Sequence, residues 1–139
     1  MIEREIIIRK LSSLSEYYTD LETARKELNW ETFLSDKVVR RYVERTLHIA
    51  IEACLDIANH IISYEGYREP KSNQDTFQVL IEEGIFDKDF GQRMMKMAQF
   101  RNVIVHDYIK IQPEIVYAVL QKQLKDLSQF ANTMRRVYL

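Results

Sequence analysis

Apolar residues recur at steps of three and four along almost the whole of this 139-residue chain, and that spacing is the strongest constraint on its fold. Such steps place apolar side chains on one face of an α-helix, so they predict amphipathic helices. No useful length of chain alternates apolar and polar residues with the period of two that indicates a half-buried strand. With only three glycines and two prolines available to interrupt helices, the pattern predicts an all-α fold.

The apolar pattern divides into four main helices and one short helix. Their expected ends carry residues that favour helix termini: side chains that accept hydrogen bonds from free amides, a left-handed glycine, or a proline in the first turn. Residues 29–34 are expected to be a connection, and Gly91 is expected to mark close packing. The expected helices run over residues 1–28, from Ser35 or Asp36 to Gly66, from Ser72 or Asp75 to Gly84 (the short one), from Asp87 onward, and from Pro113 almost to the end.

Length and composition predict a single folded domain over residues 1–139. A chain of this size can bury one substantial core but not two, and 46% hydrophobic residues argue against disorder. The net charge of −1 gives no global basic signature. A nucleic-acid partner would therefore have to be held by a local patch of positive charge.

Cysteine content and the N-terminal segment predict a cytoplasmic protein. Cys54 is the only cysteine, so no intramolecular disulfide can form, and its apolar neighbours predict a buried thiol and not a nucleophile. Charges interrupt the apolar run at the N-terminus, which therefore does not read as a signal peptide. No apolar run approaches the roughly 20 residues that span a bilayer, so no membrane association is expected.

The long helix predicted between residues 35 and 66 carries polar residues at helical spacing opposite its apolar stripe. Two interpretations stay open: a solvated surface with ion pairs one turn apart, or one wall of a functional cleft. His48, Glu52 and Asp56 imitate a metal-binding face, but no second histidine lies nearby in the sequence, so no metal site is expected. The polar residues are Arg41, Arg45, His48, Glu52, Asp56 and Asn59.

A second polar group lies within the apolar segment 100–108. Arg101, Asn102, His106 and Tyr108 bring together a guanidinium, an amide, an imidazole and a phenol, interleaved with Val103, Ile104 and Val105. In an ordinary helix, Arg101 would be a surface charge and Asn102 a local helix cap. His106 would be a buried imidazole with its hydrogen bonds made, and Tyr108 would lie at the edge of the core. Alternatively, they form a site.

The spacing of Arg101 and His106 sets a geometric condition on any such site. Five residues apart on an uninterrupted α-helix, the two side chains lie roughly 140° apart around the axis. They reach one small site only if the helix ends between them, if the long arginine side chain reaches around the helix, or if a second copy of the chain supplies the other residue of the pair. The third solution predicts a homodimer.

An arginine with a histidine can cleave RNA without a metal or any other cofactor. The 2′-hydroxyl of the substrate is then the nucleophile, and the protein supplies proton transfer and charge stabilisation. Imidazole titrates near pH 6.5, and guanidinium stays charged and grips phosphate oxygens. The expected products are a 2′,3′-cyclic phosphate and a 5′-hydroxyl. The chain carries no glycine-rich phosphate loop, nucleophile elbow or metal-ligand motif that would point to another chemistry.

The segment from Arg101 to Tyr108 matches the Arg-x4-His-x-Tyr motif of HEPN domains, and the chain around it resembles the HepT-like branch of that family. The resemblance covers nearly the whole chain, and the three motif positions show no departure. Further matching segments are Arg41 to Leu47, Ile51 to His60, Leu80 to Phe86 and Val116 to Phe130.

The resemblance implies an up-and-down helical bundle that forms a homodimer, with two copies of the motif facing one cleft. HepT-like proteins are metal-independent endoribonuclease toxins, and their antitoxin partner is an MntA-type nucleotidyltransferase. Carried onto this chain, Arg101 stabilises the phosphate, His106 is the general acid or base, Asn102 orients the site, and Tyr108 receives AMP from the partner. The added negative charge and bulk of AMP would compete with RNA at the cleft.

Two other functions are compatible with the sequence. A non-catalytic helical subunit could bind a nucleotide or present a substrate to a nucleotidyltransferase, although such an adaptor does not require the complete pair of Arg101 and His106. A small helical interaction protein without chemistry is the third. Growth arrest on expression, abolished by His106→Ala, distinguishes the toxin from the adaptor.

Overall fold

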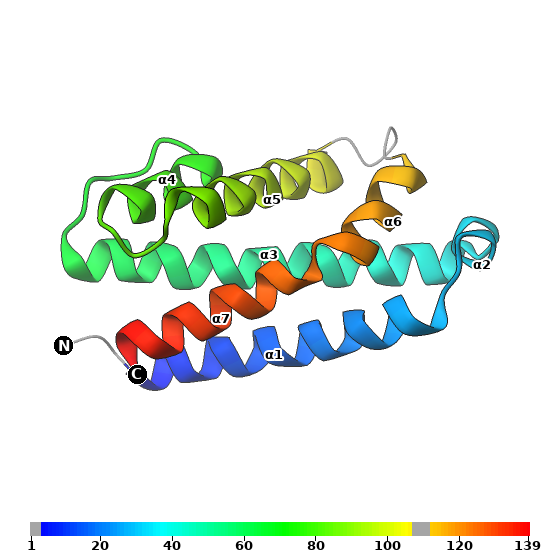
Figure 1. Ribbon diagram of the computed structural model, residues 1–139, viewed down its shortest axis with the longest axis horizontal. Helices are drawn as coiled ribbons and strands as arrows, with labels where there is room; N and C mark the ends of the chain where they lie inside the picture. The colour runs from blue at the N-terminus through cyan, green and yellow to red at the C-terminus, as the bar shows by residue number, and fades with distance from the viewer. Residues whose placement is uncertain (1–3, 107–111) are drawn as a thin grey trace.

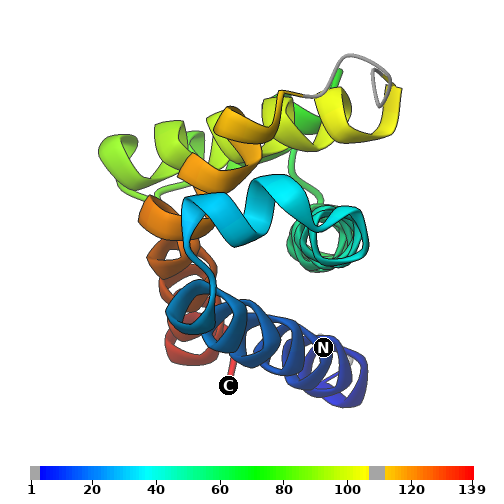
Figure 2. The ribbon, with the colours of Figure 1, turned by 90° about the vertical axis from the view of Figure 1, so that its right-hand side faces the viewer.

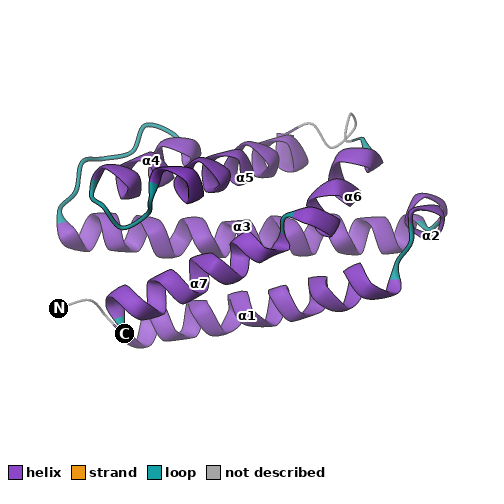
Figure 3. Ribbon diagram, in the orientation of Figure 1, coloured by secondary structure: helices purple, strands orange, loops and turns teal. Residues whose placement is uncertain are grey.

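The structure is a computed structural model that describes residues 4–106 and 112–139, and all of the regular structure in these residues is helical (Figure 3). The predicted all-α fold is confirmed. The helices are α1 (Arg4–Glu27), α2 (Trp30–Ser35), α3 (Lys37–Glu65), α4 (Asn73–Glu82), α5 (Lys88–His106), α6 (Pro113–Lys122) and α7 (Leu124–Tyr138).

Helix α3 is the central element of the bundle (Figure 1). It packs against α1 and α7 on one side and against α4 and α5 on the other. The direction of the chain reverses between α1 and α3, between α3 and α5, and again between α5 and α7, which confirms the expected up-and-down arrangement. Seen along the bundle, α3 lies between the α1/α7 pair and the α4/α5 pair (Figure 2).

The ends of α3 are those that the sequence predicts. Asp36 caps its start, because a side-chain oxygen of Asp36 accepts hydrogen bonds from the amides of Val38 at 3.0 Å and Val39 at 3.2 Å. Gly66 closes it in the left-handed region with φ 71°, where a side chain would be strained. Between these caps the helix is long enough to contribute to the core along most of the bundle.

Residues 30–35 form the short helix α2, so the predicted connection at 29–34 is wrong. Asn29 is the reason, because its side-chain oxygen accepts a hydrogen bond from the amide of Thr32 at 2.8 Å and so caps a helical turn. Trp30 and Phe33 then pack against Tyr117 of α6, with ring centroids 5.4 and 5.2 Å from it. As expected, these aromatic rings cover one end of the core.

The predicted last helix is divided at Gln123 into α6 and α7. Gln123 has φ −120° and ψ 0°, outside helical geometry, and the chain changes direction there (Figure 1). Leu120 before the break and Leu124 after it are both buried. Apolar residues therefore keep their helical spacing across the break, and the periodicity could not reveal it.

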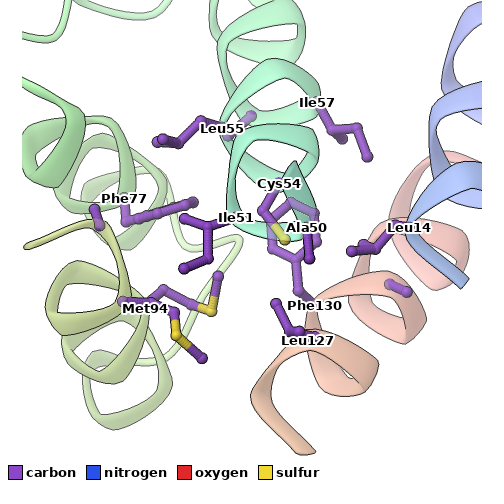
Figure 4. Packing of buried hydrophobic residues seen from close by; sticks show 14 of the residues in the cluster. Leu14, Ala50, Ile51, Cys54, Leu55, Ile57, Phe77, Met94, Leu127 and Phe130 are labelled. Atoms are coloured by element: carbon purple, nitrogen blue, oxygen red, sulfur yellow. The ribbon is translucent and has the colours of Figure 1, made fainter. Parts of the chain in front are cut away.

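The buried core surrounds the middle of α3 (Figure 4). Cys54 is fully buried there, near Phe130 of α7, and burial raises the pKa of its thiol well above the ordinary value. A thiol held in its neutral form is a packing group, as the sequence predicts. None of the helices within residues 4–106 and 112–139 is both long and apolar enough to cross a membrane.

Gly91 marks a close approach between α5 and α4, as predicted. A Cβ at this position would overlap Cγ1 and Cδ1 of Ile81. We expect Gly91→Ala to destabilise the protein by about 1–2 kcal/mol, because the steric conflict outweighs the roughly 1 kcal/mol gained in helix propensity. Urea unfolding measures this loss. In a double-mutant cycle, Ile81→Ala should remove most of the penalty, and strictly additive effects would contradict the assignment.

Candidate functional site

The candidate site lies where the second half of α5 faces the middle of α3. Arg101 extends from α5, and its Nη2 donates a hydrogen bond to Oε1 of Glu52 on α3. The side chain of Arg101 is only 17% exposed and that of Glu52 is 32% exposed. Because a partly buried ion pair is weakly screened by water, Glu52 fixes the position of the guanidinium.

Asn102 holds the other arm of the same guanidinium. Nη1 of Arg101 donates to Oδ1 of Asn102 at 3.3 Å, and the same oxygen accepts a hydrogen bond from Nδ2 of Asn73 at 3.3 Å. Asn73 is the first residue of α4. Asn102 was predicted to orient the site, and this contact is compatible with that role. Asn73 was not predicted, since it lay inside an expected loop.

Acceptors from two helices thus fix the guanidinium of Arg101 without using all of its donors. One N–H of Nη1 and one of Nη2 are engaged, while Nε is buried and has no partner within the described residues. An arginine carries N–H groups beyond these. The arrangement can therefore bind an added anion while Glu52 and Asn102 keep their contacts.

His48 lies one turn before Glu52 on the same face of α3, and its Nδ1 is 3.2 Å from Nη1 of Arg45. Because a guanidinium can only donate, Nδ1 accepts this hydrogen bond and the ring proton is assigned to Nε2. Burial lowers the pKa of His48, the positive charges of Arg101 and Arg45 lower it further, and Glu52 opposes them. The imidazole is therefore neutral at neutral pH.

The polar face of α3 thus has two environments, and its interpretation as one wall of a functional cleft stays a prediction. Its middle, His48 and Glu52, lies against Arg101. Asp56, one turn further, is exposed and pairs with Lys10 of α1 at 3.7 Å, as a solvated surface would. His48, Glu52 and Asp56 do not gather as a metal site, and no three such side chains do so within the described parts of the chain.

Helix α5 continues without a break through both Arg101 and His106. This finding excludes the first of the three solutions for bringing the two residues together, in which the helix ends between them. The side chain of His106 and all of Tyr108 lie outside the described residues. The reach of the arginine side chain and the contribution of a second copy therefore stay as predictions.

Comparison with known proteins gives consistent matches. The sequence model of the ribonuclease HepT-like family matches residues 14–134. The chain is 29% identical over 131 residues to the mRNA nuclease HepT of Shewanella oneidensis, covering 94% of this chain and 97% of that protein. It is 25% identical over 124 residues to the tRNA nuclease HepT of Aphanizomenon flos-aquae, covering 89% of this chain and 84% of that protein.

Solved structures agree with these sequence matches. A chain in the crystal structure of a toxin–antitoxin with AMP-PNP superposes with a TM-score of 0.87 at 28% identity, covering 95% of this chain and 98% of that chain. The tri-AMPylated HEPN toxin of Shewanella oneidensis, in complex with an MNT antitoxin, gives a TM-score of 0.86 at 29% identity. That match covers 94% of this chain and 97% of that chain.

Proposed function

Because this chain belongs to the ribonuclease HepT-like family, we propose that it is an endoribonuclease and the toxin of a toxin–antitoxin pair, with Arg101 and His106 as its catalytic residues. The site assignment rests on the hydrogen bonds that keep Arg101 in place. Glu52 and Asn102 fix a guanidinium that keeps further N–H donors for a phosphate. Arg93 is also held by acceptors on two helices, but all three of its nitrogens are engaged, whereas Nε of Arg101 has no partner within the described residues.

In the proposed reaction, the 2′-oxygen of a ribose attacks the adjacent phosphorus and the 5′-oxygen of the next nucleotide leaves. One imidazole accepts the 2′-hydroxyl proton and another general acid protonates the departing 5′-oxygen. His106 carries one of these transfers, and a second copy of His106 in a homodimer can carry the other. Arg101 stabilises the charge that develops on the phosphate oxygens. The products are a 2′,3′-cyclic phosphate and a 5′-hydroxyl, and no metal takes part.

The proposed partner is a nucleotidyltransferase antitoxin of the MntA type, acting in the cytoplasm. Support comes from the structural relatives, one of which is an AMPylated toxin bound to its MNT antitoxin. On this chain the AMP acceptor would be Tyr108, two residues beyond His106. A phosphodiester there places negative charge and bulk beside the catalytic pair and competes with the phosphate of RNA.

The proposal is tested by incubating RNA with purified protein in the presence of EDTA. Mass spectrometry first confirms that the protein is unmodified, because AMP on Tyr108 would silence it. We expect cleavage that leaves 2′,3′-cyclic phosphate ends, and inhibition after treatment with the nucleotidyltransferase and ATP. RNA that stays intact with confirmed unmodified protein would exclude the ribonuclease and favour a non-catalytic partner subunit.

Glu52→Gln should lower the cleavage rate at saturating RNA by about tenfold to 100-fold, because the guanidinium loses its charged anchor and its alignment with the phosphate. The measurement is kcat and KM on a defined oligonucleotide. Asp56→Asn is the matched control, since Asp56 lies one turn further on α3 and is exposed. If Glu52 instead inhibited Arg101 by occupying it, Glu52→Gln would raise the rate.

A further inference from the structure

Four positively charged residues lie along the first half of α3, and three of them, at positions 37, 41 and 45, recur at four-residue steps. Their four-residue spacing places them on the same helix face as His48 and Glu52. We call Lys37, Arg41 and Arg45 the basic stripe. All three are exposed, and from Arg41 to Glu52 the helix rises about 16 Å. The stripe therefore leads along one face to the carboxylate that holds Arg101.

The basic stripe is not neutralised by acidic side chains. Within residues 4–106 and 112–139 none of its three members forms an ion pair, whereas Arg25, Arg68 and Arg93 each do. Glu44 is an acidic residue in the same half of α3. It is half-buried, and burial raises its pKa, although Arg40 and Arg41 act in the opposite direction. The stripe is thus a local positive patch on a chain whose net charge is −1.

The charge on this face changes sign at the candidate site. Beyond His48 the same face carries Glu52 and then Asp56. A polyanion is therefore attracted to the first half of α3, whose cations form no ion pairs within the described residues, whereas Glu52 and Asp56 further along are paired with Arg101 and Lys10. His48 lies at the junction, and its Nε2–H is a neutral hydrogen-bond donor, because Nδ1 is occupied by Arg45.

We propose that the basic stripe is the track along which the phosphodiester backbone of single-stranded RNA reaches Arg101, so that the strand flanking the scissile phosphate lies toward α2. This inference rests on the proposed ribonuclease function. One row of cations on one helix fits one strand, whereas duplex recognition requires contacts to both strands across a groove. Charge contacts of this kind fix position and supply affinity without reading the base sequence.

The test measures binding of a fluorescent, uniformly 2′-O-methylated single-stranded RNA by anisotropy at several salt concentrations. This probe lacks the nucleophilic hydroxyl, so the wild-type chain can be used without cleavage. Arg41→Gln/Arg45→Gln should weaken binding about tenfold at low salt, and the slope of log Kd against log salt should fall by about 0.7 per arginine. Arg136→Gln is the matched control, because Arg136 is exposed near the end of α7, at the opposite end of the bundle.

If the double variant binds the probe as tightly as Arg136→Gln does, the track is overturned. The track is also overturned if the wild-type chain does not bind the probe at low salt. Loss of nucleotidyltransferase binding with unchanged RNA affinity would instead make the stripe a protein interface and also overturn the track. Size-exclusion chromatography checks that the variants keep the wild-type oligomeric state.

Cleavage of unmodified RNA in the same buffer separates this inference from the proposed function. If the wild-type chain cleaves RNA and the double variant binds the probe with unaltered affinity, only the track is rejected. A wild-type chain that binds RNA with the expected salt dependence, but never cleaves it, rejects the proposed function and leaves the track supported.

Discussion

His106→Ala is expected to reduce RNA cleavage to background, a loss of at least about 10³-fold in kcat. General acid–base catalysis by one positioned imidazole contributes about 10²–10⁴-fold, and in a shared dimer site the substitution removes both copies. The fold should be unaffected, because position 106 is the last residue of α5 and alanine is the best helix former. The measurement is single-turnover cleavage of a labelled oligonucleotide, with circular dichroism as the folding control.

His48→Gln is the matched control for this loss. It also removes an imidazole from the candidate site, but Nδ1 of His48 is already occupied by Arg45 and is not free to take a proton. We expect kcat to change by less than about threefold, and KM to rise if His48 contacts the substrate. If the His48 variant were inactive and the His106 variant were active, the roles assigned to the two histidines would be refuted.

Arg93→Ala should lower the free energy of unfolding by about 3 kcal/mol, the largest stability effect that we expect from a single charged residue here. Nε of Arg93 on α5 donates to Oδ1 of Asp126 on α7 at 3.0 Å, and Asp126 is 1% exposed. Removing the cation leaves a carboxylate in the core without its partner. Urea unfolding followed by circular dichroism measures the change.

The exposed arginine of a second ion-pair network provides the control for Arg93. Arg68 bonds to Asp75 and Glu82 with distances of 2.7 and 2.8 Å, but it is 40% exposed, so Arg68→Ala should cost less than about 1 kcal/mol. Arg93→Met/Asp126→Leu should recover most of the loss, because apolar residues of similar volume often replace a buried pair without penalty. Equal effects of Arg68→Ala and Arg93→Ala would contradict this account.

Local signals in the sequence predicted most of the helix positions. Asp36, Gly66, Ser72 and Asp87 act over a few residues, and the structure uses each of them at a helix end. The two errors have the same kind of cause. Asn29 caps a helix too short to show a period, and Gln123 breaks a helix whose apolar spacing continues across the break.

The candidate site was predicted only in part. The motif residues Arg101, Asn102, His106 and Tyr108 are close in sequence, so their chemistry could be read from spacing and family resemblance. Their predicted roles stay predictions, because the side chain of His106 and all of Tyr108 lie outside the described residues. The structure adds that α5 does not end between Arg101 and His106. Two solutions for bringing these residues to one site remain: the long arginine side chain reaches around the helix, or a second copy of the chain contributes to the site.

The sequence by itself determined the helical class, most helix ends and the identity of the motif, because caps and apolar periods act within a few residues. Only the tertiary structure decided what holds Arg101. Glu52 is 49 residues away from it, and Asn73 is 29 residues away from Asn102. No local pattern encodes such pairs, because they come into contact only when α4 and α5 pack against α3 and place the two polar groups on the same side of the bundle.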